Sequence, residues 1–360
     1  ERFRGREPER IRQFLTPGSN HPYQALMVNV VNTRLDGSPI SSFFSVRFFP
    51  NDRRLGYSGR VHNRFGALGD DARKVEATRY LGLEIVHLGY DPQLYEARQK
   101  AARSLPLIEE TVREEPGNHQ QRFYLGREYL LLNRVDDAIA ALTLAFDGIF
   151  AEGGGPLVDA ATHLMQALTS KGENDRALQV GHKALNQHPK HPDLWFDLGR
   201  GLMRINQLTP AAEAIEKALS CLSETGSEAQ TKLVHRQWEA HELLGQIYFS
   251  TQRYADSYRH YLAALPNKPE KSDGWPVFLN SICALAIELK DQARVPQLLE
   301  HLLAHPEAPL AMFFFELDRV HKTHGRESAR IMLQEGIQGC PRLAHDPEYQ
   351  SRAFSLGFSA

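Results

Sequence analysis

The sequence is poor in cysteine, in long apolar stretches and in net charge, and each shortage excludes a class of protein. The cysteines, Cys221, Cys283 and Cys340, lie far apart and form no CxxC pair, so neither a disulfide framework nor a zinc knuckle is expected. No run approaches the roughly 18 apolar residues of a membrane-spanning helix. With 42 basic and 44 acidic side chains the formal net charge is −2, which offers no general basic surface to nucleic acid. Cysteines that are far apart fit a reducing compartment, and we expect a cytoplasmic protein with no nucleic-acid partner and no membrane span.

Sequence signatures of common enzymes are also missing. The chain has no Walker loop, no GxGxxG, no HExxH and no GxSxG. The glycines at 153–155 lack the lysine and the serine or threonine of a phosphate loop, so they are expected to form a linker. His182, His188 and His191 cluster in the sequence, but no cysteine completes a metal site there. The sequence begins at Glu1 with neither a methionine nor a signal-peptide pattern, and we expect a piece whose N-terminal part is not included.

A recurring pattern of about 34 residues dominates the chain from residue 119 onward. Four well-registered units start near residues 119, 158, 192 and 238, so successive starts are 39, 34 and 46 residues apart. Small residues recur where two helices would cross closely, namely Gly126, Ala138, Ala145, Ala177, Ala184, Gly199, Ala211, Ala218, Gly245 and Ala264. The pattern resembles the tetratricopeptide (TPR) repeat, a helix–turn–helix unit. One unit cannot bury its apolar face alone, so a stacked helical array is predicted.

The array is expected to extend to about residue 342. Two less regular units follow at 275–306 and 311–341, and the tail at 343–360 is a candidate cap. The long spacings map to 153–156 and 222–231, which predict longer loops or a lengthened helix. Residues 91–118 are expected to connect the array to what precedes it, through a helix at 92–115 with a break near Pro106.

The first 90 residues have a different character. Residues 1–20 predict a short amphipathic helix. Strands are predicted at 25–31, 40–49, 56–65 and 83–88, forming a small antiparallel α+β unit whose open edges indicate a larger sheet. The predicted fold class is therefore mainly α, a TPR-type helical solenoid preceded by a small α+β segment.

Stacked helical pairs form a concave face lined by the first helix of each pair. The outward positions in these helices include Phe123, Arg127, Gln166, Phe196, Arg200, Gln246 and Phe249. Arg127 and Arg200 hold equivalent places, each four residues after a phenylalanine. A guanidinium beside an aromatic ring suits an extended peptide that carries a carboxylate or a phosphate. The alternative is a solvated groove with ordinary packing aromatics.

Three short motifs carry a second resemblance. RFFPN at 47–51, YSGRVHN at 57–63 and IVHLGY at 85–90 precede the repeats in that order. They resemble the closing part of the catalytic domain in bacterial family-2 glycosyltransferases with C-terminal TPR units, over about residues 24–270. The resemblance implies a GT-A fold that uses a nucleotide-sugar and a divalent metal, Mn²⁺ or Mg²⁺. It also implies that the nucleotide-binding half, with its Asp-x-Asp motif, lies upstream of this chain.

The resemblance carries over to particular residues. His87 matches the histidine that completes metal coordination, and His62 matches a histidine on the acceptor side. Arg60 is placed to offset leaving-group or phosphate charge. Asn63 stands where the family has glutamate and cannot take a proton, which puts transfer in doubt. Without the family argument, His62 and His87 are as well explained as structural strand histidines.

Two functions are consistent with these features. In the first, the chain is the C-terminal part of a glycosyltransferase whose array binds or presents the acceptor or a partner protein. In the second, the chain is a non-catalytic TPR scaffold that binds a peptide or protein in its concave groove. RNA binding is disfavoured, since the concave positions mix acidic and basic residues.

Overall fold

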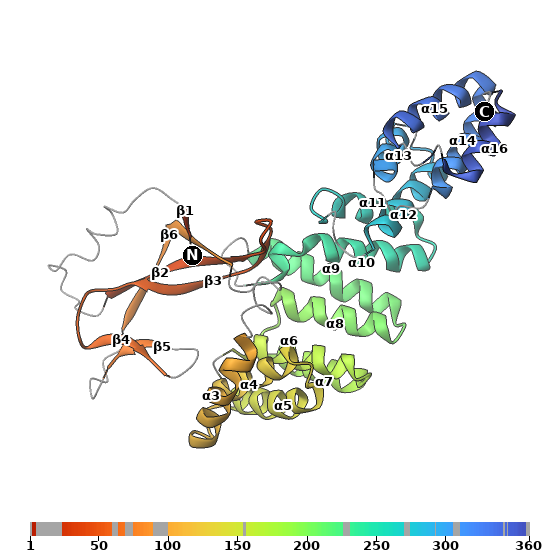
Figure 1. Ribbon diagram of the computed structural model, residues 1–360. Coiled ribbons are helices and arrows are strands. Elements are labelled where there is room, and N and C mark those ends of the chain that lie inside the picture. Colours follow the sequence, from red (N-terminus) through yellow and green to blue (C-terminus); the bar gives the residue numbers. More distant parts are fainter. Residues whose placement is uncertain are drawn as a thin grey trace. The chain divides into compact units, whose positions relative to one another are not determined.

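The computed structural model describes residues 2–4, 24–59, 64–68, 75–88, 100–153, 156–225, 231–269, 274–291, 293–304, 310–340, 343 and 345–357. The chain divides into two compact units, Glu1–Arg236 and Gln237–Ala360. The first holds a small sheet followed by helix pairs, and the described part of the second consists of helices (Figure 1). The chain is thus mainly α, a TPR-type solenoid preceded by a small strand-rich segment, as the sequence predicts.

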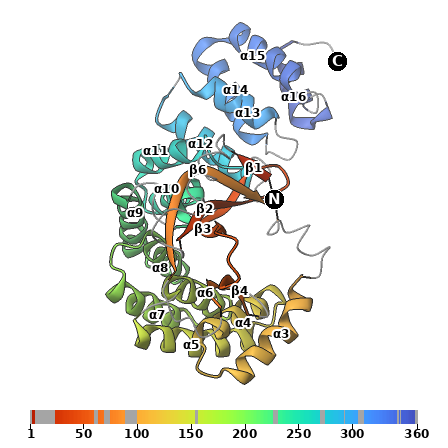
Figure 2. The ribbon, with the colours of Figure 1, turned by 90° about the vertical axis from the view of Figure 1, so that its left-hand side faces the viewer.

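Four strands form the main sheet, in the order β1-β6-β2-β3. They are β1 (Arg2–Arg4), β2 (Gln24–Thr33), β3 (Pro39–Phe48) and β6 (Glu76–His87). The strands β2 and β3 form an antiparallel hairpin. Its turn contains Gly37, which has a φ of +86°, and the Ser38 N–H donates to Asp36 Oδ1 at 2.8 Å. Figure 2 shows β6, β2 and β3 running side by side.

Two features of this segment differ from the sequence prediction. Strand β6 pairs with β2 in parallel rather than antiparallel. The strand β3 ends beside the start of β2, where Phe48 is opposite Leu26, and β6 also begins there, with Glu76 opposite Gln24, so β6 runs in the direction of β2. The single strand predicted at 56–65 is a separate hairpin of β4 (Leu55–Ser58) and β5 (Arg64–Ala67). The predicted helix at 1–20 is wrong at its start, where β1 pairs with β6, and its remainder lies outside the described residues.

Alternation along β2 gives the sheet one apolar face. Leu26, Val28 and Val30 are buried and pack with Leu83 and Ile85 of β6. The intervening positions point to the opposite face, where Asn29 Nδ2 donates to Glu84 Oε1 at 2.9 Å. The predicted strand at 83–88 is therefore the second half of a longer one.

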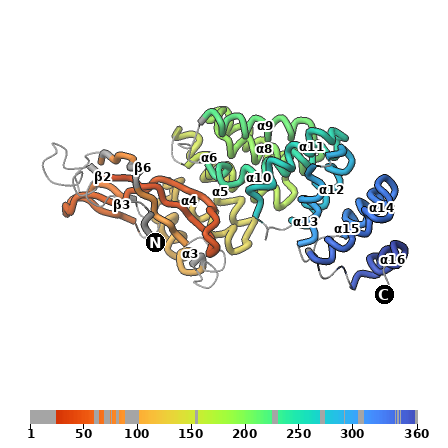
Figure 3. Tube along the Cα trace, turned by 90° about the horizontal axis from the view of Figure 1, so that it is seen from above, coloured from red at the N-terminus to blue at the C-terminus, as the bar shows by residue number. Residues whose placement is uncertain are grey.

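The helices of the first unit follow one another in chain order, and most of them are labelled in Figure 3. They are α3 (Lys100–Glu114), α4 (His119–Leu131), α5 (Val135–Glu152), α6 (Leu157–Ser170), α7 (Asn174–Gln187), α8 (Pro192–Arg204) and α9 (Leu208–Thr225). A single 3₁₀ turn, η2 (Leu233–His235), follows. The starts of α4, α6 and α8 agree with the predicted repeat starts within one residue. The break predicted near Pro106 is wrong, because α3 continues through this exposed residue and gives up only one backbone hydrogen bond there.

Close crossings explain the small residues of the repeats. A Cβ atom on Gly126 of α4 would lie 2.5 Å from Leu142 Cγ of α5, and one on Gly199 of α8 would lie 2.5 Å from Ile215 Cγ1 of α9. These distances are shorter than van der Waals contact, so only glycine lets each pair of helices approach this closely. The interhelical turns use left-handed residues such as Asn133 (φ 57°).

The second unit contains α10 (Gln237–Ser250), α11 (Tyr254–Ala264), α12 (Trp275–Glu288), α13 (Val295–Ala304), α14 (Ala311–His324), α15 (Arg326–Gly339) and α16 (Pro347–Ser355). One apolar cluster runs through it from Tyr258 to Leu356. Asp346 caps α16 by accepting from the Glu348 N–H at 2.8 Å. The boundary between the units lies inside the predicted array at 119–342. Among the described residues, no helix is both long and apolar enough to cross a membrane.

Candidate functional site in the helical groove

A small pocket of about 100 Å³ lies between α6, α8 and the segment that contains η2. It is lined by Thr162, His163, Gln166, Asp193, Phe196, Asp197, Arg200, Lys232, Leu233 and Arg236. Gln166, Phe196 and Arg200 are three of the residues predicted to face the groove, so the structure brings these three together. The other four predicted groove residues lie outside this pocket.

Two phenylalanine–arginine pairs stand in the groove. The Arg127 guanidinium lies 5.8 Å from the ring centre of Phe123, and the Arg200 guanidinium lies 5.8 Å from that of Phe196. Arg236 approaches the same Phe196 ring at 5.6 Å. Both rings are buried, with 2 % and 3 % exposure. The rings therefore form the floor of the groove, and the arginines hold cation–π positions above it.

The segment 231–236 is fixed to α8 by the carboxylate of Asp193. Asp193 Oδ1 accepts from Thr231 Oγ1 at 2.5 Å and from the Leu233 N–H at 2.9 Å, while Oδ2 accepts from the Lys232 N–H at 2.9 Å. Asp193 is buried in the first turn of α8 and Thr231 is buried beside it. Three donors on one buried carboxylate compensate for its lost hydration, so the segment is held firmly.

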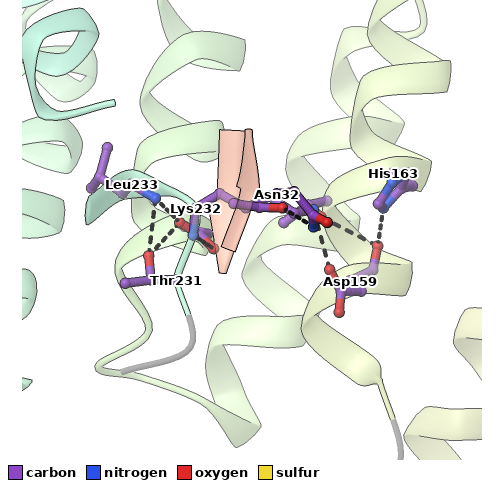
Figure 4. Close-up of polar contacts among 9 residues, drawn as sticks. Asn32, Asp159, His163, Thr231, Lys232 and Leu233 are labelled. Atoms are coloured by element: carbon purple, nitrogen blue, oxygen red, sulfur yellow. Dashed lines mark hydrogen bonds and ion pairs between the residues drawn. The ribbon is translucent and has the colours of Figure 1, made fainter. Parts of the chain in front are cut away.

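Lys232 extends from this anchor toward α6, where its Nζ lies 3.1 Å from Asp159 Oδ1 (Figure 4). Both side chains are partly exposed, so the ion pair itself stabilises the fold little. The ion pair instead fixes the position of the Lys232 ammonium group, over the space between α6 and α8.

His163 contributes a neutral group to the pocket. Burial lowers the pKa of His163 to about 3, helped by the nearby charges of Lys232 and Arg127. Its Nδ1 lies 2.6 Å from the Asp159 carbonyl oxygen, which can only accept, so Nδ1 carries the proton and Nε2 keeps a lone pair. The ring also packs edge-on against Phe123, with 5.5 Å between centres.

The carboxyl of Asp197 is the titratable acid of the pocket. Burial raises its pKa to about 6, although Arg200 opposes the shift from 3.4 Å away. The pocket is lined by three cationic and two acidic side chains, and a third acid just outside it, Asp159, is paired with Lys232. The cations of the pocket are thus accompanied by as many nearby carboxylates.

The pocket segment also contacts the sheet. His235 of η2 lies with its Nε2 3.3 Å from Ser42 Oγ of β3. Asn32 of β2, which Figure 4 also shows, is buried and donates Nδ2 to Ser41 Oγ at 2.9 Å. The end of the β2–β3 hairpin thus lies beside the segment that supplies Lys232.

The predicted catalytic and metal residues are only partly described. His62, Arg60 and Asn63 lie outside the described residues. His87 is half-buried at the end of β6, opposite Asn32 in the parallel register. Within the described part of the chain, no three His, Cys, Asp or Glu side chains lie close enough to hold a metal ion. The described histidines His182, His188 and His191 therefore belong to no such group, and neither does His87.

The last two predicted groove residues belong to the second unit. On α10, Gln246 is half-buried, and Phe249 is 46 % exposed with its ring 5.6 Å from that of Tyr254. Their positions agree with the outward side of a first helix. The role of Gln246 and Phe249 in binding stays a prediction.

Sequence reasoning missed Lys232 and Arg236, because it took groove residues only from the first helix of each repeat. These two side chains come from the connection between the third and fourth units. The signal for them was the 46-residue spacing between those units, which indicated added chain.

Comparison with known proteins supports the repeat and, over a short stretch, the second resemblance. Residues 93–148 match the family model described as tetratricopeptide repeat. The SPbeta prophage-derived glycosyltransferase SunS of Bacillus subtilis (strain 168) is 37 % identical over 59 residues, as is glycosyltransferase SunS of Bacillus phage SPbeta. Those residues are 16 % of this chain and only 14 % of either relative's length. The family match begins ahead of the predicted first repeat at 119.

Solved structures with a similar arrangement are distant in sequence. A MamA fragment from Desulfovibrio magneticus RS-1 is 15 % identical, with 50 % of this chain and 93 % of that one covered and a TM-score of 0.40. The pilF protein of Pseudomonas aeruginosa is also 15 % identical, with 66 % and 97 % covered and a TM-score of 0.44.

Proposed function

We propose that this chain is the repeat-bearing part of a glycosyltransferase, and that its groove binds a peptide segment of an acceptor or partner protein. TPR arrays are protein-binding scaffolds, and the pocket formed by α6, α8 and 231–236 is the observation that carries the proposal. It places charged, aromatic and hydrogen-bonding groups around one pocket. Such a surface matches the polar backbone and side chains of an extended peptide.

The groove offers specific groups to a peptide. Gln166 is exposed at the pocket and can donate and accept, as a backbone amide requires. His163 Nε2 is an acceptor for a backbone N–H. Arg200 offers donors to a carbonyl or carboxylate over the Phe196 ring. Together these groups bind main chain and side chain of one segment.

The glycosyltransferase part of the proposal is supported by the three motifs and by the 37 % match over 59 residues. In it, His62 and Arg60 act on the acceptor side and His87 is one ligand of a Mn²⁺ or Mg²⁺ ion. Because His87 belongs to no group of three metal-binding side chains within the described residues, further ligands would come from a nucleotide-sugar domain upstream. A bound metal would neutralise diphosphate charge on the nucleotide-sugar.

Peptide binding is tested by selecting a random-peptide library on the 360-residue chain and measuring the selected peptides by fluorescence anisotropy. Arg200→Ala should weaken them about tenfold, because a charge-assisted hydrogen bond is lost. Arg176→Ala, on the second helix α7, is the matched control and should change nothing. Equal binding by all three proteins would refute the groove.

The catalytic part is tested separately, in the protein with its upstream domain. UDP- and GDP-sugars with Mn²⁺ should raise Tm, and His87→Ala should reduce the rise. No rise, or one that His87→Ala leaves unchanged, would favour the non-catalytic scaffold, whose groove function would be unaffected.

A further inference from the structure

We propose that the pocket between α6, α8 and 231–236 is a subsite for an uncharged amide of the bound peptide. In it His163 Nε2 accepts from an N–H of the amide, and the carboxamide of Gln166 makes the second contact. The amide belongs either to an asparagine or glutamine side chain or to the peptide main chain. This inference rests on the proposed function and deepens it, because it names the chemistry that the groove selects and the residue that selects it.

The His163 ring is held in one orientation. Its Nδ1 lies 2.6 Å from the Asp159 carbonyl oxygen, one turn earlier in α6, as Figure 4 shows. The rings of His163 and Phe123 lie edge to face, with 5.5 Å between their centres. Because a carbonyl oxygen can only accept, the proton of the ring stays on Nδ1 and Nε2 presents a lone pair. The direction of this acceptor is set before a ligand arrives, which reduces the entropy cost of binding.

The acceptor at His163 is neutral and reachable. Burial lowers the pKa of this ring to about 3, so it carries no charge at neutral pH. Within the part of the chain that the structure describes, no group donates a hydrogen bond to Nε2, and this nitrogen is not one of the buried polar atoms that lack a partner. It is therefore open to a ligand at the pocket that His163 lines. The group that meets it must carry an N–H or an O–H.

Gln166 supplies the complementary groups three residues further along α6. At this spacing the two side chains lie on the same face of the helix, and both line the pocket. The Gln166 side chain is exposed, so its carboxamide can turn to donate with Nε2 and to accept with Oε1. An incoming amide has a carbonyl oxygen and at least one N–H. The same amide can thus accept from Gln166 and donate to His163.

Charged side chains around the pocket pair with one another, so they favour neither an anion nor a cation. Lys232 Nζ lies 3.1 Å from Asp159 Oδ1. Arg200 Nη1 lies 3.4 Å from Asp197 Oδ1. Asp193 accepts from three donors of the inter-repeat segment. A charged ligand group would lose hydration here without gaining a partner of its own, whereas an uncharged amide avoids that cost.

The size of the pocket fits a single amide group. A volume of about 100 Å³ holds roughly three waters at ~30 Å³ each, and an amide consists of one carbon, one oxygen and one nitrogen. A carboxylate has the same size, so volume does not separate the two. His163 separates them, because carboxylate oxygens bring only lone pairs to the lone pair of Nε2. The pocket should therefore prefer glutamine to glutamate, although their side chains have almost the same shape.

Defined peptides test the subsite on the full 360-residue chain. A short Gly/Ser peptide carries glutamine, asparagine, glutamate, lysine or alanine at its centre, and binding is measured by saturation-transfer NMR, which detects weak ligands. The glutamate peptide should bind about tenfold more weakly than the glutamine peptide, because it leaves Nε2 without a donor. The lysine peptide should also be weaker, since the nearby acids are already paired. Equal binding of glutamate and glutamine, tighter binding of a charged peptide, or no binding of any peptide overturns the subsite.

The same peptides separate the two sources of the amide. Binding of the glutamine or asparagine peptide about tenfold tighter than the alanine peptide assigns a side-chain carboxamide. If alanine binds as tightly as glutamine, an ester in place of the central backbone amide removes one N–H while keeping the shape of the chain. A loss of about tenfold in the ester then assigns the main chain. Equal binding of alanine and glutamine with no loss in the ester overturns the subsite.

Two variants test the residues themselves. His163→Phe keeps an aromatic ring beside Phe123 but has no acceptor, so the preference for glutamine over glutamate should disappear, with circular dichroism confirming the fold. Gln166→Leu changes an exposed position and should weaken the preferred peptide about tenfold. Gln179→Leu, exposed on the second helix α7, makes the same change away from the pocket and should have no effect. A preference that persists in His163→Phe, or an equal loss in the control, refutes the assignment.

Failure of the subsite and failure of the peptide groove give different results. Peptides selected from the random library that bind the native chain, and bind His163→Phe and Gln166→Leu equally well, would keep the groove and remove the subsite. A chain that binds neither the selected nor the defined peptides would remove both. Selected peptides that carry an uncharged amide at one common position, and that weaken about tenfold in His163→Phe, support both.

Discussion

Asp193 and Leu233 are 40 residues apart in the sequence and are joined by a hydrogen bond of 2.9 Å from the Leu233 N–H to the Asp193 carboxylate. This bond ties the segment that follows the third repeat to the first helix of the same repeat. It turns an inter-repeat connection into part of the groove. The stability of the connection and the charge of the pocket should therefore depend on the same carboxylate.

The first prediction concerns stability. Asp193→Ala leaves the buried Thr231 hydroxyl and two backbone N–H groups without their acceptor, so the free energy of unfolding should fall by about 3 kcal/mol. Urea unfolding followed by circular dichroism measures the loss. Glu213→Ala, exposed on α9, is the control and should stay close to the native chain. A similar small change in both variants would show that the anchor contributes little.

The second prediction concerns the pH dependence of stability. Burial raises the pKa of Asp197 to about 6, so folded Asp197 loses its negative charge as the pH falls through that value. An unfolded aspartate ionises at about pH 4, so the free energy of unfolding should fall as the pH increases from about 4 to about 6. His163, with its pKa near 3, stays neutral over this range, and burial also lowers the pKa of nearby His191.

Asp197→Asn provides the control for this pH dependence. The amide carries no charge at any pH, so urea unfolding of Asp197→Asn should show a smaller fall in stability over this range. A fall of the same size in Asp197→Asn would assign the dependence to another group. The sign is opposite to that of a salt-bridged acid, whose lowered pKa adds stability as the pH rises.

The third prediction tests the close crossing of α4 and α5. Gly126→Ala places a Cβ 2.5 Å from Leu142 Cγ, so the helices must separate and the free energy of unfolding should fall by about 1–3 kcal/mol. Gly117→Ala meets nothing within 4 Å and should be neutral or slightly stabilising. Chemical denaturation of the two variants gives the comparison. An equal effect would mean that the crossing can relax.

These crossings show what was predictable from sequence. The regular spacing of small residues such as Gly126 and Gly199 predicted the helix pairs, because each pair repeats the same local contact. The sheet was less predictable, since a strand's partner and direction depend on the path of distant chain. Nothing local in β6 distinguishes parallel pairing with β2 from antiparallel pairing.

The groove was predictable only where it follows the repeat. Gln166, Phe196 and Arg200 occupy outward positions of first helices, so their offsets placed them on one face. Lys232 and Arg236 have no such offset, because they lie between units. Their position depends on a hydrogen bond to Asp193 that no periodicity encodes.

The fourth prediction concerns the second unit, where Lys268 is held in an apolar setting. Its Nζ lies 2.7 Å from Glu242 Oε2, and its side chain is 1 % exposed between the rings of Trp238 and Phe278. Lys268→Met leaves Glu242 largely buried without its partner and should cost about 3–5 kcal/mol of unfolding free energy. The double variant Lys268→Met with Glu242→Leu removes both charges and should recover most of that loss. Trp195→Phe, placed in every chain, restricts the tryptophan signal to Trp238 and Trp275, so fluorescence reports the second unit. A double variant as unstable as the single one would show that the pair is needed for more than neutralising a buried charge.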